Sequence, residues 1–147
     1  MAHISWHVYG YGICTDTIKT TPEKIENLLI HAPKLRERIH ESFKDYEINT
    51  PSVDDYTETV EELFENCCGV ATLLKAVILE AEDLGLVACD DYDCSDFLVF
   101  TPEYPWQMTE IERSMTEEKL NEIFRKYVNI LTDAVIEIDN QTVENGG

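Results

Sequence analysis

Hydrophobic and polar side chains alternate along the first part of the chain, from residue 3 to residue 14. This period of two predicts a β-strand with one buried face. The apolar face would carry Ile4, Trp6, Val8 and Cys14, and the opposite face would carry His3, Ser5, His7, Tyr9 and Tyr11. Gly10 and Gly12 fall on the apolar side near the end of the strand, where they can allow a bulge or the close approach of a covering helix.

Apolar residues next recur at every third or fourth position, which predicts two helices in succession. Thr21 as N-cap and Pro22 at the first helical position begin the first helix. The sequence Ala32-Pro33 ends it, because a proline cannot continue a helix. The second helix carries apolar residues spaced by about four: Leu35, Ile39, Phe43 and Tyr46.

The longest helical pattern runs from about residue 52 to residue 84 and predicts one long central helix. Ser52 or Asp54 can cap its beginning, and Gly85 can end it in the left-handed conformation. Gly69 would kink this helix without ending it. The adjacent Cys67 and Cys68 would lie inside it and pack as small hydrophobic side chains.

Two short strands, residues 86–89 and 97–100, are predicted around a turn at residues 90–96. The segment that follows, residues 101–106, contains two prolines, which remove backbone donors and make it a stiff loop. Tyr104 and Trp106 in this loop are either aromatic residues of a protein interface or lids over the hydrophobic core. The sequence leaves both interpretations open.

The last part of the chain predicts a helix, a strand and a tail. A helix that begins at Ser114 or Thr116 carries an apolar stripe over residues 120–131. Residues 134–139 alternate like a strand, and residues 140–147 resemble a flexible polar tail. The order of elements predicts a single α+β domain over residues 1–147, in which helices cover a small antiparallel or mixed sheet of about four strands.

Net charge is the strongest compositional signal. The 147 residues contain 30 acidic and 11 basic side chains, giving a net charge of −19. Residues 51–100 hold much of this excess, with Lys75 as their single basic residue. Such a field repels nucleic acid and anionic membranes and attracts basic protein surfaces, so we expect neither direct nucleic-acid binding nor membrane binding.

Acidic residues of the predicted long helix form a stripe. At about 100° per residue, four of them fall within roughly a 60° sector: Asp54, Glu58, Glu61 and Glu65. Asp55 and Glu62 flank this stripe. The helix dipole favours acids only in the first turn. The stripe is therefore either a solvated helix face or a row of charges that fits a groove built for phosphates.

A second acidic group lies in the predicted turn and consists of Asp90, Asp91, Asp93 and Asp96. It resembles the opening of a calcium loop, but the sixth and twelfth positions hold Asp96 and Pro102, where an EF-hand needs glycine and glutamate. We therefore expect no metal site here. The group is interpreted as a polar hairpin tip or as part of an acidic contact surface.

Catalytic and cofactor motifs are not recognised in the chain. The five cysteines match no zinc spacing, and a Cys89–Cys94 disulfide would form only in an oxidising compartment. His3 and His7 are too far apart along a strand to bind one metal ion together. A Cys-His nucleophile would have to be assembled across the fold, so we expect no cofactor and retain a small enzyme only as an alternative.

The segment from Glu122 to Asp133, EIFRKYVNILTD, resembles uncharacterised small proteins of Gram-positive gut bacteria and their phages. In size, acidity and lack of catalytic motifs, the chain also resembles phage anti-CRISPR proteins and other DNA-mimicking inhibitors. This second resemblance implies a non-enzymatic protein that blocks a nuclease by occupying its basic channel. It implies no particular residues.

The sequence thus predicts an acidic binding protein of the cytoplasm, or of the host cytoplasm if a phage encodes it. Its partner would be a basic surface of a CRISPR effector nuclease, another nuclease or a nucleic-acid-binding protein. The expected contact residues are Asp54, Asp55, Glu58, Glu61, Glu62, Glu65, Asp90, Asp91, Asp93, Asp96, Tyr104 and Trp106. A toxin-immunity protein and an acidic housekeeping domain remain alternatives.

Overall fold

The computed structural model describes residues 5–91, 93–101 and 105–146. The described chain forms one antiparallel sheet in the order β2-β3-β1-β4. Its strands are β1 (Ser5–Cys14), β2 (Val87–Asp90), β3 (Asp96–Phe100) and β4 (Asp139–Gly146). The helices are α1 (Pro22–Leu29), α2 (Pro33–Asp45), α3 (Val53–Phe64), α4 (Val70–Glu82), the short 3-10 helix η1 (Pro105–Gln107), α5 (Glu110–Arg113) and α6 (Glu117–Leu131). The predicted α+β fold is confirmed.

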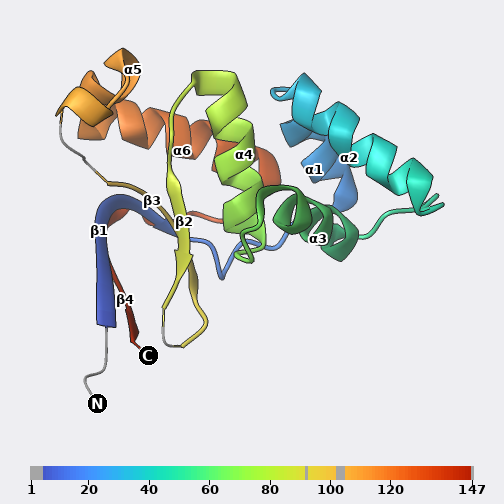
Figure 1. The fold of residues 1–147 in the computed structure, drawn as a ribbon, viewed down its shortest axis with the longest axis horizontal. Helices are drawn as coiled ribbons and strands as arrows, with labels where there is room; N and C mark the ends of the chain where they lie inside the picture. Colours follow the sequence, from blue (N-terminus) through green and yellow to red (C-terminus); the bar gives the residue numbers. More distant parts are fainter. Residues whose placement is uncertain (1–4, 92, 102–104, 147) are drawn as a thin grey trace.

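Helices cover one side of the sheet in two layers (Figure 1). Helix α4 packs on β2 and β3, and α6 packs on β1. Helices α1, α2 and α3 contact one another and lie against α4 and α6. One cluster of buried side chains joins these layers and includes the fully buried Ile13, Leu74, Leu98 and Phe124.

Helices α1, α2 and α6 begin where the sequence predicts. The Thr21 hydroxyl accepts a hydrogen bond from the Lys24 amide at 3.3 Å, and Thr116 does the same for Lys119 at 3.2 Å. Such caps satisfy amides that have no partner within the helix. The predicted hairpin is confirmed too, as β2 and β3 pair antiparallel around residues 91–95.

Helices α1, α2 and α3 are tied together through one carboxylate, Glu26. It accepts hydrogen bonds from the Tyr56 hydroxyl at 2.9 Å and from Arg36 Nε at 3.3 Å, and it lies 2.8 Å from His40 Nε2. Burial alone would raise the pKa of Glu26, but the hydrogen bonds from His40 and Tyr56 lower it below its ordinary value. These contacts hold the outer helical layer in place.

The predicted long helix is wrong, because the chain breaks between α3 and α4. Glu65 ends α3 with φ 51°, and Gly69 precedes α4 with φ 55°. Between them, the Asn66 side-chain amide donates to the Ala88 carbonyl of β2 at 3.2 Å. This bond comes from a strand distant in sequence, so the apolar periodicity, which continues through the break, cannot reveal it. Helix α4 then ends at Asp83 (φ 53°), and not at the predicted Gly85.

The predicted ending of the chain is also corrected. Residues 134–138 form no strand, and the supposed flexible tail is strand β4, which pairs with β1 from Ser5↔Gly146 to Gly12↔Asp139. The sequence DNQTVENG lacks the alternation of a half-buried strand. Its structure is decided by the length of β1, which offers a partner for every residue of β4.

Strand β1 is bent (Figure 1), and it contains Gly10 and Gly12. A Cβ atom on Gly12 would lie only 2.0 Å from the Leu98 carbonyl oxygen, so β3 approaches the β1 backbone more closely than a side chain permits. The predicted close approach thus comes from a strand and not from a helix. Ile13 and Tyr11 pack against the helical core, which reverses the predicted faces in this part of β1. The side chains of residues 3–8 lie outside the described part.

Candidate acidic binding surface

The acids at the start of α3 have a structural role as well as a charge. The Ser52 hydroxyl accepts a hydrogen bond from the Asp55 amide at 3.2 Å, and the Asp55 carboxylate accepts one from the Ser52 amide at 2.8 Å. This reciprocal pair satisfies two amides at the helix terminus, where the helix dipole also favours a negative charge. Asp54 lies beside them and is exposed.

The predicted stripe along α3 is shorter than expected. Glu58 is exposed and Glu61 is half-buried, but Glu65 leaves the helical register because it adopts a left-handed conformation. Glu62 lines a groove between α2 and α3 that also contains Arg38 and Asp45. Glu62 therefore faces α2, which brings Arg38, Glu41 and Asp45 to this groove, while Glu61 contributes to the raised pKa of Asp96 in the β2–β3 hairpin.

The hairpin turn is organised by Asp91. Its Oδ1 atom accepts hydrogen bonds from the backbone amides of Asp93 and Ser95, both at 3.0 Å. Its backbone carbonyl accepts a hydrogen bond from the Cys94 amide at 3.2 Å. Cys94 has a backbone φ of 61°, a value that residues other than glycine rarely adopt. Asp91 thus shapes the turn, and Asp93 remains exposed at its tip.

Carboxylates from three distant segments meet at the base of this hairpin. Asp90 and Asp96 are paired in the β2–β3 register, and Asp16 Oδ1 accepts the Asp96 amide at 2.8 Å. Burial raises the pKa of Asp96 to about 6, and the neighbouring acids add to this shift, with Glu61 contributing from α3. We call the following residues the acidic cluster: Asp16, Glu61, Asp90, Asp91 and Asp96.

Asp16 is the member of the acidic cluster that sequence reasoning missed. It follows β1 directly, in a segment without periodicity or motif. Its position results from strand pairing, because the Thr15 amide donates to the Asp96 carbonyl at 2.9 Å and extends the β1–β3 ladder by one bond. Only knowledge that β1 pairs with β3 could have indicated it.

Trp106 does not belong with the acidic cluster. Strand β3 begins at the turn and ends at Phe100, so the chain that carries Trp106 leaves the hairpin at the end away from the cluster. Figure 1 shows α5 at that end. Trp106 is 76% exposed in η1 and is not a lid over the core. Tyr104 lies outside the described residues.

The cysteines near the acidic cluster have suppressed acidity. Burial, with smaller effects of Asp90 and Asp96, raises the pKa of Cys68 to about 12 and that of Cys89 to about 11. Contrary to the prediction, Cys67 and Cys68 lie between α3 and α4 and not inside a helix. All five cysteines are free thiols, so the conditional Cys89–Cys94 disulfide is not formed.

These thiols are poorly suited to nucleophilic chemistry, since the thiolate is the reactive form. The histidines with described side chains also lie elsewhere. His31 packs edge-on against Tyr127, and His40 contacts Glu26. The described residues therefore show no Cys-His pair that would support the enzyme alternative.

Alkylation should distinguish these thiols. At neutral pH we expect iodoacetamide to modify the exposed Cys67 and Cys94 at least about 100-fold faster than Cys68, because a rise of three pKa units leaves about a thousandfold less thiolate. Peptide mass spectrometry over time measures the rates, and modification in denaturant serves as the control. Equal rates in the folded protein would contradict the described burial and electrostatics.

The ion pairs among the described residues involve none of the acids of α3. Within the described residues, the ion pairs join Lys24 to Asp133, Arg36 and His40 to Glu26, and Lys126 to Glu82. None of the α3 acids takes part in an ion pair of this kind. The described part of the chain also contains no group of three or more side chains placed to hold a metal ion, and none of its helices could span a membrane.

Comparison of the chain with protein-family models, with curated proteins and with solved structures finds no match. The resemblance to anti-CRISPR proteins is thus neither supported nor contradicted by known relatives.

Proposed function

We propose that this protein is a non-enzymatic binding protein that presents its acidic cluster, together with the exposed acids of α3 and Asp93 at the hairpin tip, to a basic surface of a nuclease or nucleic-acid-binding protein. The observation that carries the proposal is that Asp16 and Glu61 come from other segments of the chain to Asp96: Asp16 Oδ1 accepts a hydrogen bond from the Asp96 amide at 2.8 Å, and both carboxylates add to the raised pKa of Asp96. No Lys or Arg among the described residues forms an ion pair with any of these three. The site therefore offers concentrated negative charge to a partner.

This arrangement costs the folded protein stability. Like charges on paired strands repel each other, and burial strengthens the repulsion because the local dielectric is lower than that of water. A partner that supplies Lys or Arg side chains would remove this cost on binding. Electrostatic attraction would also speed the encounter with a positively charged channel. The partner would then lose access to DNA or RNA, which is the inhibitory mechanism we propose.

Charge reversal tests this proposal. The variant with Glu58→Lys, Glu61→Lys and Asp93→Lys changes both α3 and the hairpin without removing the helix cap or the turn-forming Asp91. The control with Glu110→Lys, Glu118→Lys and Glu122→Lys alters the net charge equally at other exposed sites. Wild-type protein and both variants are used to capture partners from host lysate, and any recovered nuclease is assayed for cleavage.

We expect the first variant to bind the recovered nuclease at least about 100-fold more weakly and the control to bind within about threefold of wild type. Affinity should fall steeply with added salt, and DNA should compete for the site. Equal loss in both variants, or affinity independent of salt, would contradict the proposal. Recovery of a basic nuclease toxin from a neighbouring gene would identify an immunity protein with the same binding chemistry.

A further inference from the structure

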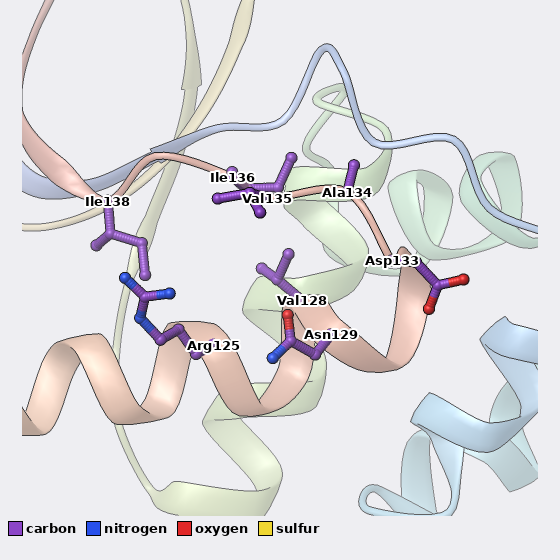
Figure 2. Close-up of a pocket in the computed structure, with 8 residues that line it drawn as sticks. All are labelled: Arg125, Val128, Asn129, Asp133, Ala134, Val135, Ile136 and Ile138. Carbon is purple, nitrogen blue, oxygen red and sulfur yellow. The ribbon is translucent and has the colours of Figure 1, made fainter.

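A small recess lies between α6 and the segment that follows it, residues 132–138 (Figure 2). Its volume is about 200 Å3. Five of its eight lining residues are apolar, namely Val128, Ala134, Val135, Ile136 and Ile138. Arg125, Asn129 and Asp133 complete it. None of these residues belongs to the acidic cluster, so this site is independent of the proposed function.

Arg125 is the unusual member of this lining. Figure 2 shows its guanidinium directed toward Ile138, with the Asn129 amide on the same helix face. The side chains of Arg125 and Asn129 are both exposed, and the described residues provide neither of them with a hydrogen bond or an ion pair. In a chain with 30 acidic and 11 basic side chains, a guanidinium beside apolar residues and without a carboxylate partner points to an external anion.

The two ends of the recess differ in charge. Asp133 lies at the end away from Arg125 in Figure 2 and pairs with Lys24 at 3.8 Å. Its carboxylate disfavours a second negative charge at that end. Between the two ends, Val135 is 91% exposed, although it borders the recess. A bound aliphatic chain would cover this side chain and remove its apolar surface from water.

We propose that this recess binds a small aliphatic monocarboxylate. The carboxylate pairs with the Arg125 guanidinium, which can donate two parallel hydrogen bonds, and the Asn129 amide donates a third. The alkyl chain packs on Val128, Val135 and Ile136. The volume lies below the about 300 Å3 that is usual for drug-sized ligands, so the ligand carries a short chain.

The test uses isocaproate as the probe and records methyl NMR spectra of the protein. We expect saturable shifts at the methyl groups of Val128, Ile136 and Ile138, with a Kd in about the millimolar range. Isocaproamide has the same chain without the charge, and acetate has the charge with almost no chain. Each should bind at least about tenfold more weakly, because each lacks one of the two interactions.

Arg125→Gln and Lys126→Gln form a matched pair, since each removes one positive charge from neighbouring positions of α6. We expect Arg125→Gln to weaken isocaproate binding at least about tenfold and Lys126→Gln to leave it nearly unchanged. Circular dichroism confirms that both variants are folded. Binding of isocaproamide as tight as that of isocaproate, equal effects of the two substitutions, or shifts without saturation would each overturn the proposal.

Discussion

Replacing Gly12 with alanine is expected to destabilise the protein by about 3 kcal/mol or more, a large part of the roughly 5–15 kcal/mol that holds a domain of this kind together. The added Cβ would lie 2.0 Å from the Leu98 carbonyl oxygen and 2.8 Å from Val99 Cα. Both are backbone atoms of the central strand β3, so they cannot move aside without breaking the β1–β3 ladder. Urea unfolding followed by circular dichroism measures the loss.

Gly85→Ala is the matched control for this prediction. The atom nearest to its added Cβ is Glu112 Oε2 at 3.1 Å, the end of a flexible side chain. We expect this variant to unfold within about 0.5 kcal/mol of the wild-type protein. If Gly12→Ala were as stable as Gly85→Ala, the close approach of β3 to β1 would be wrong.

Asp96→Asn is expected to stabilise the protein at neutral pH, which is the opposite of the usual effect of a substitution at a partly buried polar residue. Burial and the neighbouring acids raise the pKa of Asp96 to about 6, so the folded state resists its ionisation. Ionised Asp96 thus lowers stability above pH 6. The neutral asparagine lacks this cost, and we expect a gain of about 1 kcal/mol after allowing for solvent screening.

The stability gained by Asp96→Asn should depend on pH in a defined direction. The favourable contribution of protonated Asp96 is fully present below its unfolded pKa of about 3.8 and is lost as the pH rises through about 6. The advantage of Asp96→Asn should therefore shrink by more than half between about pH 7.5 and about pH 4.5. Added salt should reduce it too.

Asp93→Asn makes the same chemical change in the same hairpin, but at an exposed position outside the acidic cluster. We expect its stability to stay close to that of wild type at both pH values. Thermal unfolding at each pH compares the three proteins. An advantage of Asp96→Asn that is absent, or that grows as the pH falls, would contradict the raised pKa and the convergence of acids around it.

Local signals in the sequence were sufficient for much of the fold. Thr21 with Pro22, Ser52 with Asp55, and Thr116 start helices through bonds to residues three positions away, and these bonds are encoded in the adjacent sequence. The apolar stripe of α6 and the β2–β3 hairpin likewise depend on short-range patterns. These features are confirmed because no distant contact opposes them.

Errors occurred where a distant segment decides the local structure. Helix α3 stops before Asn66, whose side chain binds the β2 backbone, although the apolar pattern continues into α4. Residues 139–146 become a strand because β1 supplies partners for them, although their own sequence resembles a tail. In both cases, hydrogen bonds between residues more than 20 positions apart in the sequence outweigh weak local conformational preferences.

The sequence by itself determined that this protein is acidic, that its negative charge is concentrated in residues 51–100, and that it folds as helices on a sheet. Only the tertiary structure brought Asp16 and Glu61 to Asp96, moved Trp106 to the other end of the hairpin, and placed Arg125 beside a recess with apolar side chains in its lining. Charge and periodicity are properties of neighbouring residues. Convergence depends on which strands pair, and strand pairing is decided by contacts between segments that the linear pattern does not relate.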